Sequence, residues 1–352
     1  MRDDISFYGN SRIRFGESGA FPTKRISVLI CVQTHMDYTK HTVAQLKELC
    51  KERNIRGISG KNKKDLLALL EPKETVPQHR QDVVLGDTLQ ILPTLEADSA
   101  QIIIADPPYN IGKDFGNDSD KQPMDEYLRW CDRWITECLR ILKPNGTMFI
   151  YGFSEILALI LSRVPYNINR RWIVWHYTNK NVPSLNFWQR SHESIIVLWK
   201  TDKVFHRDDI REAYTDGFLK GAAGKERKAT KGRFSSGDKK TTYTAHPDGA
   251  LPRDVIKNPA LAGGAGMNER VNHPTQKPLA LCDKLLRSCR QTEGYVLVPF
   301  AGSGSECVAA KNLGLPFLGI EINPEYVELI HRRLTSQTEE APPLSEFQQE
   351  TL

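Results

Sequence analysis

The chain has 352 residues, of which 39% are hydrophobic and 26% are charged, an ordinary balance for a globular protein. This length allows one large α/β domain and a small accessory module. The net charge of +5 permits nucleic-acid binding without demonstrating it. No apolar run approaches the roughly 20 residues of a membrane-spanning helix, and the run at 26–32 is too short for a signal peptide. We therefore expect an intracellular protein, cytoplasmic or, in a eukaryotic host, nuclear.

The cysteines indicate core packing and no metal site. Cys131 and Cys138 are seven residues apart in a helical pattern, as are Cys282 and Cys289, so each pair falls on one helix face. Zinc ligands usually stand about two to four residues apart, with a second pair elsewhere. We expect all seven cysteines to be reduced thiols.

The first 81 residues predict a small helical module between irregular segments. Residues 1–38 lack periodicity and predict an irregular lead-in. Within a module at 39–72, Thr42 is a suitable N-cap for one amphipathic helix, and a leucine-rich stretch predicts a second after the turn at 57–60. A polar linker follows at 73–81, with Pro72 directly before it and Pro77 within it.

Strands and helices alternate over 82–334. Apolar strands are predicted at 83–85, 102–105, 147–151, 172–177, 194–199, 296–298 and 317–320. Amphipathic helices are predicted at 124–142, 279–289, 305–313 and 324–334. This alternation predicts an α/β fold with a doubly wound, mostly parallel sheet of the Rossmann type. The rhythm is lost in a basic, glycine-rich insert at about 201–270, and the acidic tail at 335–352 is expected to be disordered.

A glycine-rich turn follows the predicted strand at 296–298. Gly302 and Gly304 let the backbone approach a ligand closely, and the helix after them adds N–H donors. Such a loop alone is equally consistent with a ligand site and with an ordinary tight turn between a strand and a helix. The next strand, however, ends at Glu321, 17 residues after Gly304, where nucleotide-binding sheets place a carboxylate for ribose hydroxyls. Because no Gly-Lys-Ser/Thr follows, the ligand is expected to carry an adenosine without polyphosphate.

The most specific motif is Asp106-Pro107-Pro108-Tyr109, at the end of an apolar strand. The exocyclic amine of adenine is a poor nucleophile, because its lone pair is delocalised into the ring. The Asp106 carboxylate and the Pro107 carbonyl can accept its two N–H bonds, and Tyr109 offers a face on which a flipped base stacks. For Asp-Pro alone, an ordinary strand-ending turn would be the better interpretation.

The chain resembles the DNA amino-methyltransferases over residues 82–334. The tetrad matches their catalytic motif and Phe300 to Gly304 match their Phe-x-Gly-x-Gly loop, in the order of the permuted β group. The resemblance implies S-adenosylmethionine (AdoMet) as cofactor, adenine N6 as target, and direct attack of the amine on the methyl group. It leaves cytosine N4, an RNA adenine or a catalytically silent DNA-binding homologue as alternatives. The cofactor-binding residues that it implies are Asp87, Thr275, Lys277, Phe300, Ala301, Gly302, Ser303, Gly304 and Glu321.

The chain departs from this family at one position. Val298 stands where the family usually carries the aspartate of an Asp-Pro-Phe motif. The resemblance implies that this missing carboxylate lies near the methionine moiety, so cofactor affinity is the property that the departure affects. Val298 is the one residue that favours the catalytically silent homologue.

Two segments are candidates for contact with double-stranded DNA. The basic run within the insert lies where the family has its target-recognition region, although such runs are often only solvated loops. Residues 42–70 resemble a SAP domain, a small DNA-binding module, and a plain helical hairpin is the alternative. The proposed DNA-binding residues are Arg53, Lys63, Lys64, Lys225, Arg227, Lys228, Lys231 and Arg233. A restriction endonuclease partner and a homodimer stay open.

Overall fold

The computed structural model describes residues 41–52, 60–70, 81–112, 120–177, 179, 186–221, 223–228, 231–232, 236–237, 240–242, 244–264 and 266–336. The predicted lead-in, linker residues 73–80 and tail residues 337–352 lie outside these ranges. The chain divides into two compact units, Met1–Pro72 and Lys73–Leu352, and each is described by itself.

The first unit contains two helices, α1 (Val43–Glu52) and α2 (Lys63–Leu70). Thr42 is the N-cap of α1, as predicted: its Oγ1 accepts from the Gln45 backbone N–H at 3.3 Å, and the Gln45 side chain accepts from the Thr42 N–H at 2.8 Å. Asn62 caps α2 in the same way. The helices enclose a small core of Leu46, Cys50 and Leu66.

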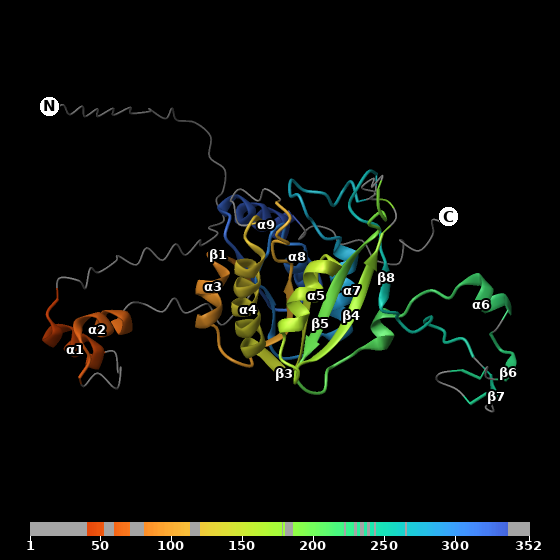
Figure 1. The fold of residues 1–352 in the computed structure, drawn as a ribbon, viewed down its shortest axis with the longest axis horizontal. Helices are drawn as coiled ribbons and strands as arrows, with labels where there is room; N and C mark the ends of the chain where they lie inside the picture. The colour runs from red at the N-terminus through yellow and green to blue at the C-terminus, as the bar shows by residue number, and fades with distance from the viewer. Residues whose placement is uncertain are drawn as a thin grey trace, which may run out of the picture. The chain divides into compact units, whose positions relative to one another are not determined.

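The second unit is built on a sheet that, among the described residues, has eight strands in the order β1-β10-β9-β2-β3-β5-β4-β8 (Figure 1). Every neighbouring pair is parallel except the two pairs made by β5. The predicted α/β fold with a mostly parallel sheet is therefore confirmed. The strands are β1 (Gln81–Leu85), β2 (Ala100–Ala105), β3 (Leu142–Gly152), β4 (Asn169–His176), β5 (His192–Trp199), β8 (Val255–Lys257), β9 (Tyr295–Val298) and β10 (Phe317–Glu321).

Helices cover both faces of this sheet, as the alternation in β2 illustrates. Ile102 and Ile104 point into one core, and Ile103 and Ala105 point into the other. The first core is completed by α7 (Leu279–Cys289), α8 (Ser305–Asn312) and α9 (Pro324–Ser336). The second is completed by η2 (Leu92–Thr94), α4 (Met124–Ile141) and α5 (Ser154–Arg163), and Figure 1 shows α4 and α5 on the near side of the sheet. Cys131 and Cys138 are buried on α4, and Cys282 and Cys289 are buried on α7.

The insert at about 201–270 is only partly irregular. It contains η4 (Arg207–Ile210), α6 (Asp216–Gly221) and the antiparallel pair β6 (Glu226–Lys228) and β7 (Lys240–Thr242). Its strand β8 belongs to the main sheet, where it pairs with β4. None of the described helices is long and apolar enough to cross a membrane.

Two elements differ from the sequence expectation. Helix α5 was not predicted, because its sequence SEILALILSR is apolar almost all round and lacks a clear 3.6-residue stripe. Strand β3 begins at Leu142 and includes Pro144 and Gly146, whereas the sequence predicted a strand only at 147–151. The backbone N–H of Leu142, the C-cap residue of α4, still donates to the Cys138 carbonyl, and the strand follows the helix directly.

Candidate active site

The predicted catalytic and cofactor motifs meet at the carboxyl ends of neighbouring parallel strands. Asp106 and Phe300 are far apart in sequence, but β2 pairs directly with β9, with Ile103 opposite Leu297. Ligands in such sheets bind outside the carboxyl ends of the strands. A cavity of about 180 Å³ opens there. It is lined by Thr88, Asp106, Pro107, Pro108, Tyr109, Ile111, Asp120, Gln122, Trp130, His273, Thr275, Lys277, Pro299, Phe300, Ala301, Gly302, Ser303, Glu306, Ile320, Glu321, Ile322 and Tyr326.

The tetrad is held by hydrogen bonds from the residues that follow it. Asn110 adopts a positive φ of 57°, and its backbone N–H donates to the buried Asp120 carboxylate at 2.5 Å. The Tyr127 hydroxyl on α4 donates to the Pro108 carbonyl at 2.8 Å. Within the described part of the chain, the Pro107 carbonyl accepts no hydrogen bond. It therefore remains available as an acceptor at the cavity wall.

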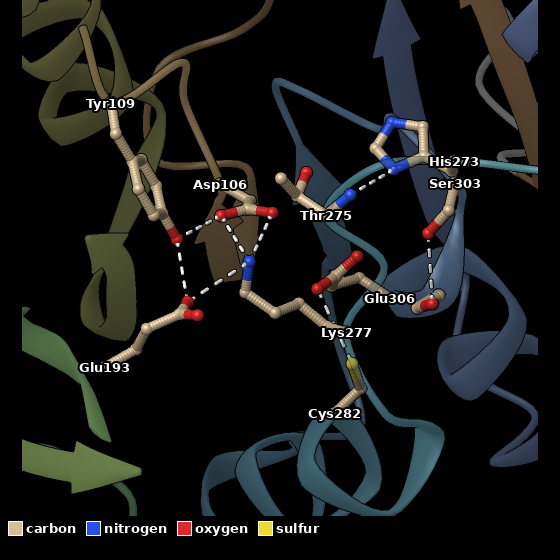
Figure 2. A network of polar contacts seen from close by, with 10 residues as sticks. Asp106, Tyr109, Glu193, His273, Thr275, Lys277, Cys282, Ser303 and Glu306 are labelled. Atoms are coloured by element: carbon tan, nitrogen blue, oxygen red, sulfur yellow. Dashed lines mark hydrogen bonds and ion pairs between the residues drawn. The ribbon is translucent and has the colours of Figure 1, made fainter. Parts of the chain in front are cut away.

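The Asp106 carboxylate is at the centre of a buried polar network (Figure 2). Lys277 Nζ donates to Asp106 Oδ1 and Oδ2 at 2.8 and 2.7 Å, and lies 3.7 Å from Glu193 Oε2. The Tyr109 hydroxyl lies 2.7 Å from Asp106 Oδ1 and 3.2 Å from Glu193 Oε2, and donates to these oxygens. Lys277 and Asp106 side chains are 4% and 16% exposed, so the pair is largely removed from water.

Burial and charge fix the protonation of this network. Burial alone would lower the pKa of Lys277, but Asp106 and Glu193 outweigh it and hold that pKa above its usual value. Burial, reinforced by the same two carboxylates, raises the pKa of Tyr109 well above its usual value. Lys277 is therefore charged and Tyr109 neutral at physiological pH. Nearby, burial lowers the pKa of His273 to about 4, so its ring is neutral as well.

The glycine-rich loop is shaped by close approaches. Gly302 has a φ of 51°, and a side chain there would come within 3.1 Å of His273 Nε2. Its N–H donates to Glu321 Oε2 at 2.8 Å, while Glu321 Oε1 accepts from the Asn323 N–H at 2.8 Å. Burial raises the pKa of Glu321, and these two backbone donors oppose the shift. Gly304, with a φ of 76°, packs against Ile330 of α9.

Most of the predicted site residues line the one cavity, including the whole tetrad. Two predicted cofactor residues, Asp87 and Gly304, are absent from the residues that line it. The Asp87 carboxylate instead caps helix α3 (Thr88–Ile91), where Oδ1 accepts from the Leu89 N–H at 2.9 Å. Lys277, a predicted cofactor-binding residue, contacts Asp106 in this structure, and its role toward a cofactor stays a prediction.

The predicted DNA-contacting residues lie on both units. Lys63 and Lys64 at the start of α2 are exposed, as are Lys225 and Lys231 in the insert. Arg227 and Lys228 are part of β6. Arg53 and Arg233 lie outside the described residues.

Several residues of the site were not predicted from the sequence. Glu193 is a buried carboxylate at the start of β5, and Glu306 is one in the first turn of α8. A charge at the edge of an apolar run was the available signal for both. Trp130 was predicted only as part of the α4 core face. It contacts Phe300, at 5.4 Å between ring centroids, and also lines the cavity.

The fold of the second unit has counterparts among solved structures. A doubly wound sheet with a glycine-rich loop after β9 and a carboxylate ending β10 is the fold of the class I AdoMet-dependent methyltransferases. The solved structure of the PvuII DNA methyltransferase (cytosine-N4-specific) shares this fold, with a TM-score of 0.52 and 15% identity over 71% of this chain and 85% of that chain.

The family follows from the sequence comparison. The family model for N6/N4-type DNA methylases matches residues 100–332, and the chain belongs to this family. It is 29% identical to the type II methyltransferase M.HpaI of Haemophilus parainfluenzae, over 73% of this chain and 75% of that protein. It is 32% identical to the DNA adenine methyltransferase YhdJ of Escherichia coli (strain K12), over 72% of this chain and 82% of that protein. The methyl donor that this fold and family imply is AdoMet.

Proposed function

We propose that this DNA methyltransferase transfers a methyl group from AdoMet to the N6 amino group of adenine in double-stranded DNA, at a specific site. The observation that carries the proposal is the pair of acceptors at the cavity wall. The Asp106 carboxylate and the unengaged Pro107 carbonyl are adjacent in sequence and line the same cavity as the cofactor loop. Two acceptors for two N–H bonds are what an exocyclic amine needs to lose its planar conjugation.

The cavity residues fit the parts of AdoMet. Phe300, Trp130 and Ile322 supply apolar surface for an adenine ring, and Ile322 is 56% exposed. Glu321 uses one lone pair of each oxygen on a backbone N–H, which leaves acceptor sites for ribose hydroxyls. When bound, AdoMet supplies an electrophilic methyl group on its sulfonium. Thr275 and Lys277 are the proposed partners of its methionine carboxylate.

Binding of the target amine requires an exchange at Asp106. Lys277 Nζ donates a hydrogen bond to each Asp106 carboxylate oxygen in this structure, so the amine must replace at least one of these hydrogen bonds. Glu193, 3.7 Å from Nζ, keeps a negative charge beside Lys277 during that exchange. Asp106 then accepts an amine N–H bond, and it is the nearby base for the proton that the amine loses on methylation. Tyr109 is the proposed stacking partner of the flipped base.

Adenine is favoured over cytosine by two observations. The tetrad begins with aspartate, whereas the serine form is more typical of cytosine-N4 enzymes. The relative YhdJ, which is 32% identical, is named as an adenine methyltransferase. The likeness to the PvuII enzyme concerns the fold alone.

DNA contact is assigned to the exposed lysines of the insert and of the SAP-like module at 39–72. Lys225 and Lys231 would contact phosphates near the target, and Lys63 and Lys64 would hold the DNA close to the enzyme. The likeness to M.HpaI, a type II methyltransferase, supports a restriction endonuclease as a functional partner.

Mass analysis of nucleosides tests the target base. Unmodified DNA is incubated with the enzyme and labelled AdoMet, digested, and analysed for methylated nucleosides. The proposal predicts N6-methyldeoxyadenosine. N4-methyldeoxycytidine would replace the adenine assignment by the cytosine one, and methylation of RNA alone would exclude DNA as the substrate. Absence of any methylated nucleoside, together with absence of AdoMet binding, would favour a silent DNA-binding homologue.

A further inference from the structure

Glu306 is the charged residue of the cavity that the proposed mechanism does not use. Its side chain projects from the first turn of α8, directly after the glycine-rich loop, and the residue is 3% exposed. It lines the cavity together with Asp106, Lys277 and Thr275. A buried carboxylate is costly to retain unless a partner compensates its charge.

The other carboxylates that line the cavity have strong partners. Asp106 accepts two hydrogen bonds from Lys277. Asp120 accepts from the backbone N–H groups of Asn110 and Ile111, and Glu321 is satisfied by backbone donors in the same way. These three carboxylates therefore need no ligand to offset their burial.

Glu306 has no charged hydrogen-bond partner among the described residues. Its donors there are its own backbone N–H and the Cys282 thiol, which lies 3.5 Å from Oε1, and no ion pair involves it within the described part of the chain. Figure 2 shows one Glu306 oxygen directed at Cys282, while the other makes no contact with the residues drawn. A thiol is a weak donor and carries no charge. The carboxylate therefore keeps acceptor capacity that these two donors do not use.

We infer that Glu306 binds the α-ammonium group of the methionine moiety of AdoMet, an inference that rests on the proposed function. Among the described residues, Lys277 is the one lysine or arginine that lines the cavity, against four carboxyl groups, so a cationic ligand group is favoured there. AdoMet carries a primary ammonium that can donate charge-assisted hydrogen bonds to a carboxylate. Val298 replaces the aspartate that the family usually has near the methionine moiety. Glu306, which lies beside the cofactor loop, supplies a carboxylate to the same cavity.

The protonation of Glu306 offers a second signature. Burial, followed by repulsion from Asp106, raises its pKa to about 7, and Lys277 opposes this shift. An ammonium ligand favours the ionised carboxylate, so binding should release a proton at slightly acidic pH. Burial raises the pKa of Tyr151, Cys282 and Cys307, and Lys277 and Arg333 stay charged, so none of these five neighbours titrates in that range. The other charged group close to Glu306 is the Asp106 carboxylate.

Titration calorimetry with the full-length protein and AdoMet tests the inference. Glu306→Gln should weaken AdoMet binding by about 10- to 100-fold, the usual loss for a charge-assisted hydrogen bond. At pH 6.5, comparison of buffers should show proton release on AdoMet binding by the wild type and much less by the variant. Cys282→Ala removes the thiol but keeps the carboxylate, and Glu212→Gln changes a carboxylate paired with Lys284 outside the cavity. Both controls should bind AdoMet within about threefold of the wild type.

A second comparison changes the ligand and keeps the same two proteins. S-adenosylhomocysteine is compared with its analogue in which hydrogen replaces the α-amino group. The analogue should bind the wild type about 10- to 100-fold more weakly, and this difference should largely vanish in Glu306→Gln. Equal binding of the two compounds to the wild type would overturn the inference, as would a Glu306→Gln variant with unchanged AdoMet affinity.

The outcomes separate this inference from the proposed function. If the wild type and Glu306→Gln bind AdoMet with equal affinity, the ammonium site is refuted and the proposed methyl transfer is not affected. Wild-type protein that binds no AdoMet would refute both. Normal AdoMet binding with no methyl transfer to any nucleic acid would refute the proposed reaction alone.

Discussion

Replacement of Lys277 by methionine is expected to destabilise the second unit by about 3–5 kcal/mol at pH 8, the usual cost of breaking a buried ion pair. Methionine retains the apolar stem, so little cavity is created. It removes the ammonium that lies 2.7 and 2.8 Å from the two Asp106 oxygens and 3.7 Å from Glu193. Two largely buried carboxylates would then face each other without a cation.

The pH dependence gives the sign of the effect. Because the folded-state pKa of Lys277 lies above its unfolded value, the wild-type stabilisation is fully present below about pH 10 and is lost at higher pH. In Lys277→Met the deficit should shrink as the pH falls from 8 to 5, because protonation removes the charge of the two buried carboxylates that have lost their cation.

Urea denaturation followed by tryptophan fluorescence measures this deficit. All six tryptophans lie between residues 130 and 199, so the signal reports on the second unit. Lys284→Met is the matched control, because Lys284 pairs with Glu212 at 2.8 Å with both side chains 23% exposed. The control should lose about 1 kcal/mol or less. The reasoning is wrong if both variants lose the same stability at pH 8, or if the Lys277→Met deficit grows in acid.

Three further predictions concern ligands. Glu321→Gln should weaken AdoMet binding about tenfold in calorimetry, while the transfer rate at saturating AdoMet changes little; an unchanged affinity would remove Glu321 from the cofactor site. Tyr109→Phe should keep most of the transfer rate, whereas Tyr109→Ala should lower kcat/KM by about 10- to 100-fold through lost stacking; equal losses would show that the hydroxyl matters more than the ring. Reversal of Lys63 and Lys64 to glutamate should weaken DNA binding in fluorescence anisotropy and flatten its salt dependence, and an unchanged salt slope would contradict their contact with phosphates.

The fold was largely predictable because its strands and helices carry strong local patterns. The apolar run before Asp106 and the run before Pro299 each predicted a strand, and each ends at the cavity. The amphipathic pattern of α7 gave both of its ends correctly. Helix α5 was missed because it is apolar on nearly every face, so its periodicity gives no signal.

The site was predicted where its residues form motifs and missed where they do not. Asp106 and Lys277 were each identified, but their contact spans 171 residues and depends on how the strands are ordered in the sheet. Glu193 and Glu306 belong to no motif and acquire their meaning only from burial beside Asp106. Asp87 was assigned to the cofactor through the family resemblance. Its carboxylate caps helix α3 in this structure, and its contact with a cofactor stays a prediction.

The central claim is that the Asp106 tetrad carries out methyl transfer. The most direct test measures the single-turnover rate of methyl transfer from labelled AdoMet to unmodified DNA, for the wild type and for Asp106→Ala, with AdoMet affinity measured on both proteins. Loss of the acceptor should lower the rate by about 100-fold or more while AdoMet still binds. Transfer at the wild-type rate by Asp106→Ala would contradict the claim.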